Sequence, residues 1–130
     1  MLRGMQVRGS FEVKMSGEPP YAEQDGITFS RARFDKVFSG PLDATSVVQG
    51  LMVLTTDPKV RAYVAIERIE GALEGRAGSF VVAHHAVGSA FSLTIMPGSG
   101  RGALEGIDGV MRIEITEGKH YYEVEYTLPG

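Results

Sequence analysis

The chain has 130 residues, enough to bury a core as one domain over residues 1–130, and its hydrophobic fraction of 43% is that of a globular protein. Its 13 basic and 16 acidic residues are interspersed and give a net charge of -3, so no basic face offers a footprint for nucleic acid. The absence of cysteine excludes disulfides and thiolate chemistry. No stretch approaches the roughly 20 apolar residues that cross a bilayer, so we predict no membrane-spanning segment and no membrane partner.

The amino-terminal segment alternates polar and apolar side chains instead of carrying the apolar core of a signal peptide, so we expect a cytoplasmic protein. The same period of two predicts a β-strand over residues 5–15, and a polar loop with two prolines follows over residues 16–26. Further strands are predicted over residues 27–39, 46–55, 62–73, 79–86, 90–96, 110–116 and 120–128. Turns are predicted at 74–78, where Gly75 and Gly78 supply positive φ, and at 88–89, 97–100 and 117–118. No segment has the spacing of an amphipathic helix.

A short glycine signature returns at a fixed interval of 31 residues. It reads GPLDA from Gly40, GALEG from Gly71 and GALEG from Gly102. A period of this length, with strands on both sides of each copy, indicates a meander of antiparallel hairpins. In a chain with 17 glycines the match can also arise by chance, and the strand prediction does not depend on it.

About eight sequential antiparallel strands leave two unpaired edges unless the sheet closes. We therefore predict an all-β fold, a closed antiparallel barrel of about eight strands, with a β-sandwich as the alternative. A barrel of about eight strands has an interior that side chains fill or that holds one small ligand.

Glu67 interrupts an otherwise apolar strand on the face of Tyr63, Ala65 and Ile69, while Arg68 takes the opposite face. One of these two charged residues is expected to point inward, and which one stays open. A carboxylate inside a small barrel must be paired, hydrogen-bonded or neutral. Glu67 is therefore either a functional group or half of a structural pair with an arginine or a tyrosine hydroxyl.

His84 shares a face with Phe80 and Val82 on the strand that follows, so it lies near Glu67 if the hairpin register allows it. Adjacent residues of a strand point to opposite faces, so His84 and His85 cannot bind one metal together, and no metal or cofactor is predicted. The glycine-rich PGSGRG from Pro97 lacks the Gly-Lys-Ser/Thr ending of a phosphate-binding loop. The ligand-binding candidates are Glu67, His84, Tyr63, Tyr126 and Met52.

A family resemblance covers residues 9–128. The string AYVAIERIEGALEGRAGSFVVAH from Ala62, followed by PGSG and GKHYYEVEYTL, resembles a bacterial family known as domain of unknown function 3224. FEVK at Phe11, PYAE at Tyr21 and FSGPL at Phe38 are similar to the same family. The resemblance implies a closed barrel like that of plant allene oxide cyclase, without an established activity, and leaves Glu67 and His84 as the chemical candidates.

Three functions follow as alternatives. The first is a barrel that binds a small apolar or amphipathic molecule, oriented by Glu67, His84 or a tyrosine. The second is an enzyme of the isomerase or cyclase kind, with Glu67 as general acid or base and His84 or Tyr126 polarising the substrate. The third is a barrel filled by its own side chains that works through its outer surface. Apolar residues on both strand faces favour a homo-oligomer.

Overall fold

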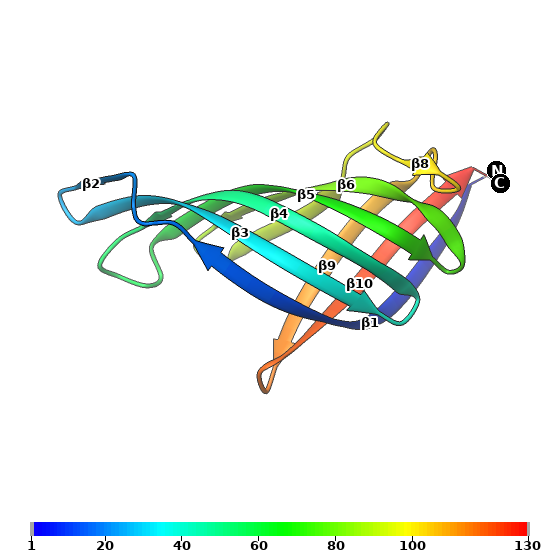
Figure 1. The fold of residues 1–130 in the computed structure, drawn as a ribbon, viewed down its shortest axis with the longest axis horizontal. Helices are drawn as coiled ribbons and strands as arrows, with labels where there is room; N and C mark the ends of the chain where they lie inside the picture. Colours follow the sequence, from blue (N-terminus) through cyan, green and yellow to red (C-terminus); the bar gives the residue numbers. More distant parts are fainter. Residues whose placement is uncertain (1, 130) are drawn as a thin grey trace.

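The computed structural model describes residues 2–129, which form ten β-strands joined by turns and loops (Figure 1). Eight of them are long or medium strands, and β2 and β8 are short additions. The bounds are β1 Leu2–Gly17, β2 Ala22–Gln24, β3 Ile27–Ser39, β4 Leu42–Leu54, β5 Arg61–Leu73, β6 Arg76–Val87, β7 Ala90–Ile95, β8 Arg101–Gly102, β9 Asp108–Thr116 and β10 Lys119–Pro129. Among these residues no helix has the length and hydropathy needed to cross a membrane.

The eight main strands form one closed antiparallel barrel. Their order is β1-β10-β9-β7-β6-β5-β4-β3, and β3 pairs back onto β1. The predicted closed barrel is confirmed, and the alternative of two packed sheets is not formed. Short β2 extends β3 as a hairpin, and β8 pairs with the beginning of β6.

Closure depends on the length of β1, which serves two neighbours in turn. Its first part, from Leu2 to Phe11, pairs with β10, and its second part, from Ser10 to Gly17, pairs with β3 (Figure 1). Gly9 precedes the change of partner, and a Cβ there would overlap the Tyr122 hydroxyl and the Ser39 carbonyl oxygen. A glycine is required at this position because the backbone and the tyrosine approach each other closely.

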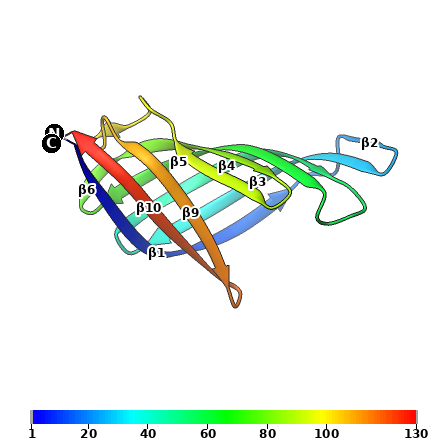
Figure 2. The same cartoon turned by 180° about the vertical axis from the view of Figure 1, so that it is seen from behind.

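The barrel has one weak seam, between β7 and β9. These strands are paired only through Leu93 with Met111 and Thr94 with Val110. From these two pairs toward the β9–β10 turn, the β9–β10 hairpin diverges from β7. This divergence is visible in both views (Figures 1 and 2). The seam therefore leaves one end of the barrel open.

The opposite end is filled by apolar side chains. Leu42, Leu73 and Leu104, the third residues of the three glycine signatures, are 1%, 0% and 1% exposed and belong to one core cluster. We call the half of the barrel that holds these leucines the closed end. The half bounded by the β4–β5 connection and the β6–β7 turn is called the open end.

Three local predictions were wrong in detail. The loop predicted over residues 16–26 contains strand β2, and β4 begins at Leu42, four residues before the predicted start. The predicted five-residue turn is a two-residue turn, in which Glu74 has φ 48° and Gly75 has φ 80°. Gly78 lies inside β6 instead, where a Cβ would overlap the Arg101 carbonyl oxygen of β8. Its role is close strand approach, not positive φ.

Candidate functional site

Glu67 is the inward-facing charged residue of β5, with a side chain that is 0% exposed. Its strand neighbours across the ladder are Val48 on β4 and Val82 on β6, so apolar side chains flank it on both sides. Arg68 points outward and pairs with Glu70 on the surface. The question that the alternation of β5 left open is thereby decided in favour of the carboxylate.

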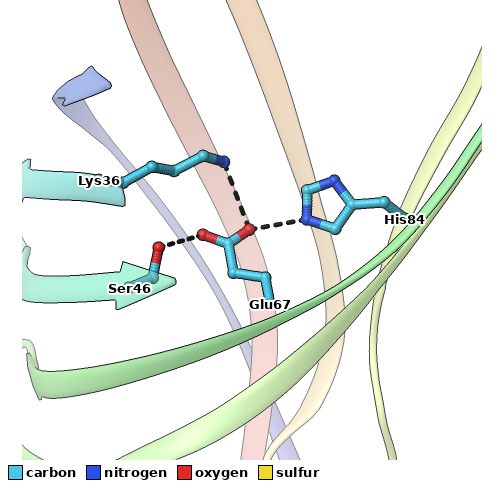
Figure 3. A network of polar contacts seen from close by, with 4 residues as sticks. All are labelled: Lys36, Ser46, Glu67 and His84. Atoms are coloured by element: carbon cyan, nitrogen blue, oxygen red, sulfur yellow. Dashed lines mark hydrogen bonds and ion pairs between the residues drawn. The ribbon is translucent and has the colours of Figure 1, made fainter. Parts of the chain in front are cut away.

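Three polar side chains hold the Glu67 carboxylate (Figure 3). The His84 Nε2 atom lies 2.7 Å from Oε1, and the Lys36 Nζ atom donates to the same oxygen at 3.3 Å. The Ser46 hydroxyl donates to Oε2 at 2.5 Å. Both carboxylate oxygens are therefore occupied, and Glu67 is compensated as a buried anion must be.

The strand register brings these four residues together. Lys36 lies directly opposite Ser46 on the β3–β4 ladder, and His84 lies opposite Ala65, two residues from Glu67 on the same face of β5. Diagonal neighbours across a ladder are within reach of long side chains. The predicted proximity of Glu67 and His84 is confirmed. The expected partner, an arginine or a tyrosine hydroxyl, is replaced by lysine, histidine and serine.

The pKa values of Glu67 and Lys36 are both shifted, because the two buried charges have different numbers of polar partners. Burial alone would raise the pKa of Glu67, but the hydrogen bond with His84, the Lys36 charge and the Ser46 hydroxyl together lower it below the ordinary value of 4.5. Burial lowers the pKa of Lys36 from 10.5, and the attraction to Glu67 offsets this only in part. The carboxylate therefore has three partners, whereas the ammonium has one carboxylate and two aromatic rings.

A cavity of about 500 Å³ opens above this network at the open end. Lys36 and His84 line the cavity, and we call the part of its wall that they form the floor. Glu67 lies beneath them and does not line the cavity. Tyr63 and Met52, both predicted ligand-binding residues, are in its wall. The apolar part of the wall includes Phe11, Val13, Phe34, Val48, Phe91, Ile113 and Ile115.

Aromatic rings fix the two polar residues of the cavity floor. The Tyr63 ring meets the His84 ring edge-on, with centroids 6.0 Å apart, and the Lys36 Nζ atom lies 4.9 Å from the centre of the Phe11 ring. Such contacts orient an imidazole and stabilise an ammonium. Burial and the Glu67 charge raise the pKa of Tyr63 to about 12, so this hydroxyl stays protonated and can donate a hydrogen bond.

Comparison with known protein families and solved structures shows the family of the chain. The model of "Protein of unknown function (DUF3224)" matches residues 7–126, which is most of the chain. The chain belongs to the DUF3224 family. A crystal structure of a DUF3224 protein of unknown function from Shewanella oneidensis MR-1 is 37% identical, with 98% of this chain and 100% of that chain covered and a TM-score of 0.93. No curated protein matches the sequence.

Tyr126 lies apart from the other predicted site residues of this DUF3224 barrel. It is buried at the closed end, where its hydroxyl donates to the Glu74 carboxylate beside the β5–β6 turn. Burial and Glu74 raise its pKa to about 12. The structure thus brings four of the five predicted residues together, namely Glu67, His84, Tyr63 and Met52, and leaves Tyr126 in the core.

Sequence reasoning missed Lys36 and Ser46. The sequence did carry a signal for Lys36, because this lysine shares one strand face with Phe34 and Phe38. A face with two phenylalanines is expected to point into the barrel. Ser46 carried no signal of its own, since its role depends on the register between β3 and β4. Among the described residues no group of three or more histidine, cysteine or acidic side chains is arranged to hold a metal ion.

Proposed function

We propose that this DUF3224 barrel binds a small, largely apolar molecule in the cavity of its open end. One observation carries the proposal: an apolar wall surrounds about 500 Å³, and buried polar groups, Lys36 and His84, lie at the floor. Ligand sites combine these two features, because the apolar area supplies affinity and a few fixed polar groups orient the ligand.

The division of the interior supports this function over that of a filled barrel. At the closed end the core leucines are fully buried, whereas the wall residues Phe34, Met52 and Tyr63 of the open end are only half-buried. Exposing such side chains to a water-filled space costs hydrophobic free energy that a ligand would recover.

Native mass spectrometry of freshly purified protein tests the proposal first. A reproducible small mass that is present natively and released on denaturation is the expected result. A titration with the neutral fluorescent dye N-phenyl-1-naphthylamine then measures affinity independently of any co-purified molecule. Absence of a bound mass together with absence of saturable dye binding would refute ligand binding.

A matched pair of variants on β6 locates the dye. Ala86 lines the cavity, whereas Ala83 is exposed on the outer face of the same strand. Ala86→Trp places a large side chain in the cavity and is expected to weaken dye binding about tenfold, a loss of about 1.4 kcal/mol. Ala83→Trp should leave dye binding unchanged. Equal loss in both variants would place the dye elsewhere.

An acid-base enzyme is the second candidate, and one contact favours it. His84 lines the cavity and its Nε2 atom is engaged by Glu67, so Nδ1 is the ring nitrogen left for a substrate. In that arrangement His84, not Glu67, would exchange a proton with a substrate, and Glu67 would position it. A ligand recovered from the protein and incubated with it in D2O should gain deuterium at carbon. His84→Gln should abolish the exchange, and no exchange with the unaltered protein would argue against an enzyme.

Homo-oligomer formation remains part of the proposal. Val37, Leu51, Val64 and Ile66 lie on the outer faces of β3, β4 and β5, and each is about half exposed. A second copy that covers this face would remove their apolar area from water. The subunit number in the same native mass spectrum tests this, and a purely monomeric protein at micromolar concentration would contradict it.

A further inference from the structure

The ionisable side chains in the cavity wall are four bases and one tyrosine. Lys36 and His84 lie at the floor, His120 is in the side wall and Arg61 is at the mouth. Tyr63 is the remaining ionisable residue of the wall, and no aspartate or glutamate of the described residues lines it. The chain as a whole has a net charge of -3, whereas the cavity wall carries bases and no carboxylate of the described residues.

The floor also has hydrogen-bonding capacity that the protein does not use. Within the described part of the chain, Lys36 Nζ makes one hydrogen bond, to Glu67, although an ammonium carries three donors. His84 Nδ1 has no partner there, because the ring bonds only through Nε2. Both residues are more than nine-tenths buried and both line the cavity, so a molecule that enters it can reach these atoms.

The charges of the network restrict what can enter. Lys36 and the Glu67 carboxylate cancel each other, and a neutral His84 that donates from Nε2 to Glu67 presents a lone pair at Nδ1. A cation would meet the Lys36 ammonium without any carboxylate in the wall. An anion would meet two donors once Nδ1 acquires a proton, and that proton restores neutrality to the buried cluster.

We propose that the ligand is an amphipathic monoanion, an apolar body with one carboxylate, whose carboxylate lies between Lys36 Nζ and His84 Nδ1. It binds with net uptake of one proton from solvent, which resides at His84 Nδ1. The inference rests on the proposed ligand-binding function and specifies its ligand class. The apolar body extends along Phe34 and Met52 toward the mouth.

The charged and titratable groups around His84 are compatible with a proton at its Nδ1 atom. Glu67 and Tyr63 of β5 and Lys36 of β3 surround it, and His120 of β10 lies in the wall of the same cavity. The residues that β4 and β7 place nearby, Ser46, Met52 and Phe91, carry no charge. On the outer side, Arg31 lines a separate groove that also reaches His84. Among the described residues, Glu67 is thus the one carboxylate that compensates a protonated His84.

Competition against N-phenyl-1-naphthylamine separates this inference from the proposed function. Decanoate, 1-decanol and decyltrimethylammonium carry the same apolar chain with a negative, neutral and positive head. We expect decanoate to displace the dye at a concentration at least about tenfold lower than 1-decanol, as one charge-assisted hydrogen bond provides. Decyltrimethylammonium should be the weakest. Dye binding with equal potency of decanoate and 1-decanol would overturn the anionic head while leaving the binding function intact. Absence of dye binding together with absence of a bound mass in the native spectrum would overturn both.

Two variants locate the carboxylate. The double variant K36M/E67Q removes both charges of the buried pair together, so neither is left uncompensated. It should lose at least about tenfold in decanoate affinity and keep its 1-decanol affinity. Arg61→Gln tests the mouth, where the side chain is exposed. Loss of decanoate selectivity in Arg61→Gln with retention in K36M/E67Q would place the carboxylate at the mouth and overturn the proposal.

Proton uptake is measured by calorimetry of decanoate binding in buffers of different ionisation enthalpy. At about pH 8 we expect about one proton taken up per decanoate bound, because that proton keeps the buried cluster neutral. His84→Gln should reduce this number to near zero, with its near-ultraviolet circular dichroism confirming the fold. No proton uptake by the unaltered protein would overturn the assignment of His84 as the second ligand of the carboxylate.

Discussion

The two ends of the barrel are built from the same strands but treat their interiors differently. At the closed end, Leu42, Leu73 and Leu104 meet in a core without exposed apolar surface. At the open end, the same strands β4 and β5 present Met52 and Tyr63 to a cavity. The weak seam between β7 and β9 accounts for the difference, because only two residue pairs join these strands, near the middle of the barrel. Under the proposed function, the closed end supplies stability and the open end binds the ligand, so the two tasks lie in different halves of one sheet.

Glu67 lies at the boundary between the two ends, and removing its charge should have the largest effect on stability. Glu67→Gln keeps the shape but leaves the Lys36 ammonium buried without a counter-charge. We expect a loss of about 4 kcal/mol in the free energy of unfolding, measured by urea denaturation. The control is K36M/E67Q, which should recover at least half of that loss. No recovery would show that the ion pair is not what Glu67→Gln disturbs.

The same variant should change the acid sensitivity of the protein. The folded-state pKa of Glu67 is lowered, so the unfolded chain binds this proton more readily, and the stabilisation by Glu67 is lost as pH falls below about 4.5 toward the folded value. Urea midpoints should therefore decline with acid more steeply for the unaltered protein than for Glu67→Gln. Parallel declines would show that other carboxylates determine the acid response.

Leu73 tests the packing of the closed end. The side chain is 0% exposed, and Leu73→Ala would leave a void among residues that the closed barrel cannot easily move together. We expect a loss of about 3 kcal/mol in the free energy of unfolding. Dye affinity should be unchanged, because Leu73 does not line the cavity. A parallel loss of dye binding would mean that the two ends are coupled.

Tyr122 sharpens the comparison through hydrogen bonding. Its hydroxyl accepts from the Leu42 amide at 2.9 Å and donates to the Ser39 carbonyl at 2.8 Å, which ties β10 to the β3–β4 turn. Tyr122→Phe leaves both backbone groups without that partner and should cost about 2 kcal/mol in urea denaturation. Tyr21→Phe, at an exposed tyrosine outside the barrel wall, is the control and should cost nothing measurable.

The barrel was predictable from sequence because its strands alternate clearly and its turns carry glycine. The orientation of β5 was not, because Val64 and Ile66 make its outer face as apolar as the inner face of Tyr63 and Ala65. The position of Lys36 two strands from Glu67 required the register of both ladders. The cavity was the least predictable feature, since it depends on how few residues β7 and β9 share and not on any residue type.

Met52 provides the smallest expected effect on stability and the most direct test of the open end. Its side chain is half-buried in the cavity wall, so Met52→Ala enlarges an existing space and creates no new enclosed void. The free energy of unfolding should fall by about 1 kcal/mol, much less than for Leu73→Ala. The two truncations should also differ in binding, because only Met52→Ala removes apolar surface from the dye site and should weaken N-phenyl-1-naphthylamine binding. If Met52→Ala destabilised the protein as much as Leu73→Ala, the open end would be packed in solution and the cavity would be closed.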